Sequence, residues 1–123
     1  MKLVVIEPLG VEKNTLNEII TKSFTNQIKV TLYNTKANSD EELIKRGKEA
    51  DIIVVANQPL NNKVINGFKN LKMLSIAFTG VDHVDLKACR NNNVIVCNSA
   101  GYSTAAVADL VFGLLICFYR NII

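Results

Sequence analysis

The sequence has no cluster of basic side chains. Its 123 residues carry a formal net charge of only +3, and the lysines and arginines form neither a run nor a stripe that could follow a phosphate backbone. A basic amphipathic helix, which would hold a membrane surface, is lacking as well. We therefore expect no nucleic acid and no membrane among the partners of this chain.

Cysteine is scarce and long hydrophobic runs are missing. Cys89, Cys97 and Cys117 are odd in number and show no C-x-x-C spacing, which argues against a disulfide framework or a zinc site. The first apolar run, residues 3–6, is too short for a signal peptide. The run over residues 105–119 is shorter than the roughly 20 residues of a membrane span. We expect a cytoplasmic protein with reduced, buried cysteines.

The apolar residues that are present follow strand and helix patterns in alternation. Helical patterns, such as residues 11–24 and the segment that Ser39 caps, separate strand patterns over residues 2–6, 28–33, 51–56, 71–78 and 94–97. Apolar strands separated by helices indicate a parallel sheet that is covered on both faces. We predict an α/β fold, a flavodoxin-like doubly wound sheet of five strands in the order 2-1-3-4-5, followed by a long C-terminal helix.

In an open parallel sheet, ligands bind at the carboxyl ends of the strands, and the loop that begins at Thr79 lies at such an end. Gly80 has no Cβ, so an anion could approach the backbone closely, and successive N–H groups could form a nest for a carboxylate or phosphate. The alternative is an ordinary turn, because glycine marks turns generally. The residues of this loop alone leave both interpretations open.

A second loop, residues 98–104, joins a strand end to a helix start, where anions bind favourably, although a simple N-cap explains it as well. His83 is the only histidine, and we interpret it as a residue that packs or bonds locally rather than as a base. Asp85 fits a helix cap and Asp82 a turn residue, so we do not predict a catalytic pair of carboxylates.

Together these loops resemble the D-isomer-specific 2-hydroxyacid dehydrogenases. The resemblance covers residues 71–122 and rests on T-G-V-D-x-x-D from Thr79, N-S-x-G-Y-S-T from Asn98 and V-A-D from Val107. Residues 1–70 fit the amino-terminal lobe of that family in pattern. The resemblance implies a flavodoxin-like substrate-binding lobe over residues 1–102. Residues 103–123 would then form an interdomain helix that leads to a Rossmann domain.

The resemblance also implies a reaction and a substrate site. The reaction is hydride transfer between a nicotinamide cofactor and a small 2-hydroxy or 2-keto acid. Backbone amides of Thr79, Gly80 and Val81 would hold the substrate carboxylate. Asn98 would face the active-site cleft, and Asn57 would border the variable end of the substrate.

For the cofactor, NAD or NADP, the resemblance implies contacts from Thr79 and from the helix that begins with Thr104 and Val107. His83, Ala100 and Asp109 depart from the Asn, Pro and Glu usual in the family, which leaves the subfamily open. The family's G-x-G-x-x-G fingerprint and its catalytic arginine, acidic residue and histidine have no counterpart in these 123 residues. We therefore expect that this chain alone neither binds the cofactor stably nor acts as a dehydrogenase.

The alternative is a non-enzymatic flavodoxin-like module for binding or subunit association. A phosphoacceptor aspartate does not follow the third strand, where Ala56 and Asn57 stand, and residues 7–10 lack the hydroxyls of a flavin phosphate loop. The final helix, ADLVFGLLICFYRNII, is apolar around most of its circumference and should expose an apolar patch. We expect a homodimer through this helix.

Overall fold

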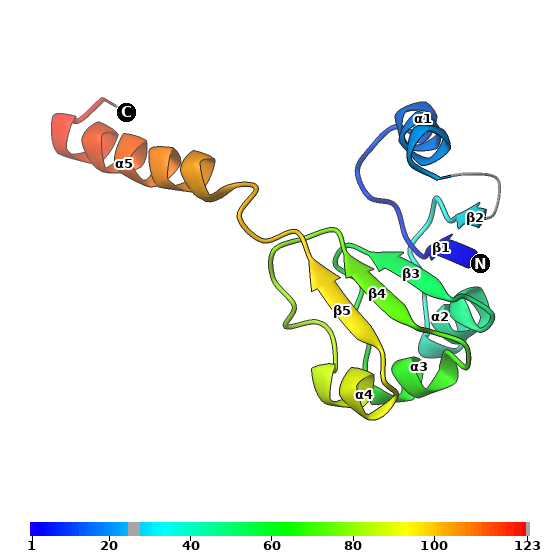
Figure 1. Cartoon of the computed structure of the whole chain (residues 1–123). Helices are drawn as coiled ribbons and strands as arrows, with labels where there is room; N and C mark the ends of the chain where they lie inside the picture. The colour runs from blue at the N-terminus through cyan, green and yellow to red at the C-terminus, as the bar shows by residue number, and fades with distance from the viewer. Residues whose placement is uncertain (25–27, 123) are drawn as a thin grey trace.

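The computed structural model describes residues 1–24 and 28–122 and contains one parallel sheet. Its strands are β1 (Lys2–Val5), β2 (Lys29–Leu32), β3 (Ile52–Val55), β4 (Met73–Ile76) and β5 (Ile95–Asn98). They lie in the order β2-β1-β3-β4-β5, and every neighbouring pair is parallel (Figure 1). The predicted flavodoxin-like fold is confirmed.

Helices alternate with these strands. They are α1 (Lys13–Ser23), α2 (Asp40–Gly47), α3 (Asn62–Gly67), α4 (Leu86–Asn91) and α5 (Thr104–Arg120). Two predicted N-caps are confirmed, because Ser39 Oγ accepts from the N–H of Glu42 at 3.2 Å and Asp85 Oδ1 accepts from the N–H of Ala88 at 2.8 Å. Asp85 therefore begins α4 and is not half of a carboxylate pair.

The hydrophobic core lies between the sheet and the layer of α2, α3 and α4. Strand alternation turns Ile53, Val55, Leu74 and Ile76 toward this layer, where each is at most 1% exposed. Burial of each such side chain contributes roughly 1.5–3 kcal/mol, so this side of the sheet provides most of the stability. The core positions the carboxyl ends of β3 and β4 side by side.

The opposite face of the sheet is less covered than predicted. Only α1 packs on it, over β1, and none of the residues of α1 is buried. The residues of β3 and β4 that point to this face, such as Ile52 and Met73, are half-buried, and Ile95 of β5 is 64% exposed. The expectation of buried cysteines is correspondingly wrong in part: Cys89 is buried, whereas Cys97 is exposed and Cys117 half-buried.

The last helix, α5, projects away from the sheet (Figure 1). Every residue from Thr104 to Arg120 is exposed except the half-buried Cys117, so the predicted exposure of its apolar surface is confirmed. Among residues 1–24 and 28–122, no helix has the length and hydrophobicity needed to cross a membrane.

Candidate functional site

The candidate site is formed by loops at the carboxyl edge of the sheet. The segments that follow β3, β4 and β5 begin at Ala56, Ala77 and Ser99, and these strands are direct neighbours. The N–H of Ala77 donates to the carbonyl O of Val55 at 2.8 Å, which extends the β3–β4 pairing to the loop. The topology therefore brings the loops predicted to bind substrate to one edge.

Asn98 and Thr79 are joined directly. The Nδ2 of Asn98 donates to the carbonyl O of Thr79 at 2.8 Å. Beside this bond, the N–H of Ser99 donates to the carbonyl O of Phe78 at 3.0 Å, and Ser99 Oγ donates to the carbonyl O of Ile76 at 3.3 Å. These three bonds fix the Thr79 loop on the start of the segment that leads to α5.

The Thr79 loop leaves a row of backbone donors unused. In the described part of the chain, the N–H groups of Thr79, Gly80 and Val81 donate to no protein acceptor. Thr79 is exposed, while Gly80 and Val81 are half-buried, so these amides lie at the surface rather than in the core. Three successive free amides form the kind of concavity that binds an anion.

Gly80 is not required by the fold. Its φ is outside the positive region, and a Cβ built on it would meet only Asp82 Oδ2, at 3.5 Å, an ordinary van der Waals contact. By contrast, a Cβ on Gly67 would lie 2.6 Å from the side chain of Ile44. The described part of the chain therefore has room for a Cβ at Gly80, in contrast to Gly67.

Glu7, which belongs to no motif of the sequence, organises the loop after β3. Its Oε1 accepts from the backbone N–H groups of Ala56, Asn57 and Gln58, at 2.9, 2.8 and 2.7 Å. The residue is 1% exposed, and its Oε2 is buried without a hydrogen-bond partner. One feature of the sequence could have indicated this role of Glu7. It is an acid that comes directly after an apolar strand, at the sheet edge where backbone amides of neighbouring loops need acceptors.

Gln58 holds the other side of the same loop. It is buried, its Oε1 accepts from the N–H of Ala37 at 3.2 Å, and its Nε2 donates to the carbonyl O of Ala37 at 2.6 Å. Asn57, which lies between the two anchored neighbours, is exposed. A rigid backbone therefore presents the Asn57 side chain to solvent at the carboxyl edge of β3.

The surroundings of His83 agree with the prediction that it packs or bonds locally and does not act as a base. Its carbonyl O accepts from the N–H of Leu60 at 2.8 Å, and its Nε2 is buried without a hydrogen-bond partner. A general base needs an accessible, oriented nitrogen, which the buried Nε2 of His83 does not provide. Burial raises the pKa of the Cys89 thiol, which argues against a reactive thiolate there.

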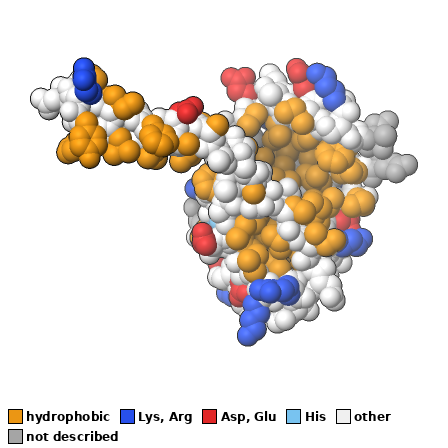
Figure 2. Space-filling model, turned by 60° about the vertical axis from the view of Figure 1, so that its left-hand side comes forward, with side chains coloured by type: hydrophobic (Ala, Val, Ile, Leu, Met, Phe, Trp, Pro, Cys, Tyr) orange, Lys and Arg blue, Asp and Glu red, His pale blue; other side chains and the backbone are white. Residues whose placement is uncertain are grey.

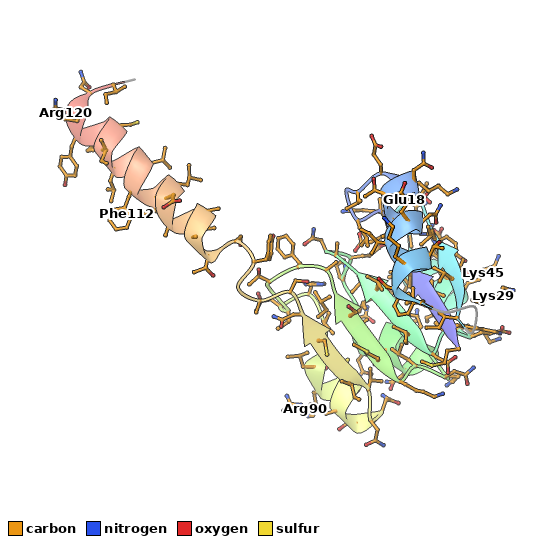
Figure 3. All side chains as sticks on the ribbon, turned by 45° about the horizontal axis from the view of Figure 1, so that its top comes forward. Glu18, Lys29, Lys45, Arg90, Phe112 and Arg120 are labelled. Atoms are coloured by element: carbon orange, nitrogen blue, oxygen red, sulfur yellow. The ribbon has the colours of Figure 1, made fainter. Side chains whose placement is uncertain are left out.

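The three arginines are placed differently: Arg46 donates to the carbonyl O of Ile6 at 2.9 Å, and Arg90 lines a cavity of about 450 Å³ together with Val81 and Asn98. Arg90 is on α4 near the start of β5, and its Nε donates to the carbonyl O of Leu86 at 3.3 Å. Arg120 is at the far end of α5 (Figure 3). Thr104 and Val107 lie at the start of the projecting helix, and Val107 is 56% exposed, so the structure does not bring Val107 against the Thr79 loop. The described residues contain no cluster of His, Cys, Asp and Glu suited to a metal ion.

The sheet order and its carboxyl-edge loops define a flavodoxin-like α/β domain of the type found in nicotinamide-dependent dehydrogenases. The chain belongs to the D-isomer specific 2-hydroxyacid dehydrogenase family: residues 4–115 match the catalytic domain of that family. The family expected from the two loop motifs is confirmed.

Several relatives are similar over most of this chain. A D-3-phosphoglycerate dehydrogenase of Methanocaldococcus jannaschii is 36% identical over 83 residues, which are 67% of this chain and 16% of that protein. One from Archaeoglobus fulgidus is 31% identical over 99% of this chain and 22% of its own length. The chain thus spans less than a quarter of these two relatives.

Solved structures agree with these relatives. The 3-phosphoglycerate dehydrogenase of Entamoeba histolytica, solved with NAD⁺ bound, has a TM-score of 0.78 and 28% identity, over 98% of this chain and 39% of that one. An acyclic imino acid reductase in complex with NADPH and D-Arg has a TM-score of 0.83 and 28% identity, over 99% of this chain and 38% of that one.

Proposed function

We propose that this chain is the substrate-binding lobe of an NAD- or NADP-dependent D-2-hydroxyacid dehydrogenase, with residues 1–102 as the lobe and residues 103–123 as the interdomain helix. The lobe binds the carboxylate of a small 2-hydroxy or 2-keto acid. The observation that carries this proposal is the row of unused amides at Thr79, Gly80 and Val81, at a glycine that the fold does not need.

The carboxylate would accept hydrogen bonds from these three amides. Such charge-assisted bonds are stronger than neutral ones, and they need no basic side chain at the site. Asn98 uses its Nδ2 on Thr79, so its Oδ1 is the atom that can accept from a substrate hydroxyl. Asn57, on the loop that Glu7 anchors, would contact the variable end of the substrate.

The cofactor would lie beside Thr79, with Thr104 and Val107 on its other side. The nicotinamide, when bound, supplies or accepts the hydride. The buried Nε2 of His83 is not available as an acid or base, and Arg90, which lines one cavity with Val81 and Asn98, stays charged and transfers no proton. We therefore propose that this chain alone binds substrate weakly, retains no cofactor stably and does not transfer hydride.

An NMR titration tests the proposal. Pyruvate, glyoxylate and hydroxypyruvate should shift the backbone amides of residues 79–81, and pyruvamide, which lacks the carboxylate, should not. A matched variant, Gly80→Ala, should weaken the shifts without changing the fold, because the added Cβ meets only an ordinary contact in the chain. Equal shifts with pyruvamide, or oxidation of NADH by this chain with any of the three acids, would contradict it.

A second role, subunit association, is favoured by the exposed α5. We propose that the chain forms a homodimer through this helix in the cytoplasm, where its cysteines, which are free in the structure, stay reduced. The molar mass in solution at micromolar concentration tests the dimer. A mass of one chain would contradict it.

A further inference from the structure

Arg46 differs from the basic side chains that project from the surface of the domain (Figure 2). It lies in the last turn of α2, and its side chain is only 6% exposed. Its Nη1 donates to the carbonyl O of Thr35, and its Nη2 donates to Thr35 Oγ1 at 3.1 Å and to the carbonyl O of Lys36 at 3.4 Å. We call residues 34–37 the β2 loop. A single buried side chain of α2 therefore holds the path of this loop.

The same guanidinium reaches the end of β1. Its bond to the carbonyl O of Ile6 ends on the residue directly before Glu7. An ion pair with Glu42, one helical turn earlier on α2, balances its charge, and its Cζ lies 4.5 Å from the centroid of the Tyr33 ring. One cation thus fixes the carboxyl ends of β1 and β2 relative to α2.

Gln58 joins the β2 loop to the loop that follows β3. Its side-chain amide makes two hydrogen bonds, and both end on the backbone of Ala37. Gln58 is 8% exposed, and its own N–H is one of the three that donate to Glu7. A displacement of the β2 loop must therefore either break the two bonds to Ala37 or carry Gln58 with it.

We infer that Arg46 is a positioning residue for the substrate site, and that it acts on Asn57 through the β2 loop and Gln58. The inference rests on the function proposed above, in which Asn57 contacts the variable end of the substrate. Glu7 holds the backbone of Asn57 from the end of β1, and Arg46 holds it from α2. The bonds described for Arg46 end on α2, on the end of β1 and on the β2 loop, so its influence falls on the variable end of the substrate and not on the Thr79 loop.

A lysine at this position would not do the same. The guanidinium presents five N–H donors in a fixed planar fork, and Arg46 distributes its donors over acceptors in two loops. A lysine ammonium is a compact charge with three donors, so it keeps an ion pair with Glu42 but does not reach all of these carbonyls at once. Arg46→Lys therefore separates the geometry of the side chain from its charge.

Two variants interrupt the connection at its two ends. Arg46→Lys releases the β2 loop. Gln58→Met removes both bonds to Ala37 and keeps an unbranched side chain of similar size. The matched control is Lys45→Met, at the exposed neighbour of Arg46 on α2 (Figure 3).

Amide hydrogen exchange, measured by NMR on the chain without ligand, gives the direct readout. The N–H groups of Asn57 and Gln58 report on the loop after β3, and the N–H of Ala88 at the cap of α4 is the reference for a general loss of stability. Relative to Ala88, exchange at Asn57 and Gln58 should be roughly tenfold faster in each of the two variants and unchanged in the control.

The double variant shows whether both ends belong to one connection. Once Gln58→Met has removed the bonds to the β2 loop, Arg46 no longer acts on Asn57, so the double variant should exchange no faster than Gln58→Met alone. Fold-changes that multiply in the double variant would overturn the inference. Exchange in Arg46→Lys equal to that of the unchanged chain would overturn it as well.

The preference between two acids gives the substrate readout. Glyoxylate has only a hydrogen at its variable end, whereas hydroxypyruvate has a hydroxymethyl group there. Both variants should leave the binding of glyoxylate at residues 79–81 unchanged and weaken that of hydroxypyruvate about fivefold. Faster exchange with an unchanged preference would uphold the positioning by Arg46 and contradict the substrate contact of Asn57. If neither acid shifts residues 79–81 in the unchanged chain, the proposed function fails, and the exchange rates alone decide on Arg46.

Discussion

Glu7 holds the backbone of Asn57, fifty positions further along the chain, through a bond of 2.8 Å from the Asn57 N–H to its carboxylate. The same oxygen accepts from the two flanking amides of residues 56 and 58. One buried carboxylate therefore determines the shape of the loop that we propose for the variable end of the substrate. Its importance for folding and for the site can be measured separately.

Replacing Glu7 with alanine should destabilise the chain by about 3 kcal/mol, because three amides, two of them buried, would lose their charged acceptor. Glu7→Gln, which keeps one oxygen acceptor, should cost less. Urea denaturation gives both values. Glu12→Ala is the matched control, since Glu12 is exposed and makes no cap bond with its side chain. A loss for Glu7→Ala no larger than that of the control would contradict the anchoring role.

Substitutions at two loop glycines should have opposite effects. Gly80→Ala should leave the free energy of unfolding within about 0.5 kcal/mol and should weaken pyruvate binding, because its Cβ projects only into space that a ligand would use. Gly101→Ala should destabilise by roughly 1 kcal/mol, since Gly101 has a φ of +88°. Thermal melts and NMR titrations measure the two properties. Undiminished pyruvate binding by Gly80→Ala would remove the main support for the carboxylate site.

Asn98→Asp should weaken the binding of 2-keto acids for two reasons. An ionised aspartate cannot donate to the carbonyl O of Thr79, and its charge would repel an incoming carboxylate. The control is Asn93→Asp, the same change at an exposed position before β5. Titration with pyruvate should give at least a tenfold weaker affinity for Asn98→Asp alone. Equal affinities for both variants would show that Asn98 does not face the ligand.

Stability should fall as the solution is acidified below about pH 5. A hydrogen bond from Lys63 lowers the pKa of Glu41 from 4.5 to about 2, and hydrogen bonds from Lys72 and from the Lys2 backbone lower the pKa of Asp51. A carboxyl whose pKa is lower in the folded state stabilises it above the unfolded pKa. That contribution is lost as the pH falls through the folded value. The Lys63–Glu41 pair is exposed on both sides, so its contribution is small and screened by salt.

Urea denaturation between pH 7 and pH 2 tests this dependence. Lys63→Met removes the partner of Glu41 and should reduce the slope of stability against pH, most clearly at low ionic strength. Lys87→Met, which removes an exposed lysine for which no such bond is found, should leave the slope unchanged. An identical slope in the unchanged chain and Lys63→Met would contradict the assignment to Glu41.

The sequence predicted the sheet order and several helix starts because these features depend on local rules. The side chains of Ser39 and Asp85 bond to amides three residues later, so a short window of sequence contains the whole interaction. The positions of the Thr79 and Asn98 loops followed in the same way, from the ends of apolar strands. Their direct contact needed the structure, because it depends on the pairing of β4 with β5.

Other features could not be read from the chain. An apolar strand such as β5 indicates that its side chains suit a buried position, but it does not show whether a helix of the same chain covers them. Ile95 and Cys97 are exposed for this reason. The role of Glu7 could not be predicted, since its partners lie about fifty residues away. The direction of α5 likewise depends on bonds made by Asn98 and Ser99 and not on the helix itself.

The strand order has a consequence for how the chain folds while it is being synthesised on the ribosome. β1 is made first but lies between β2 and β3, and its carboxyl end is completed by amides of residues 56–58. The first strand therefore waits for about half of the chain to emerge before it gains both neighbours, and such distant pairings slow folding. During that interval its apolar residues, Leu3 to Ile6, are accessible to chaperones, and translation speed near codon 58 should influence the yield of folded protein.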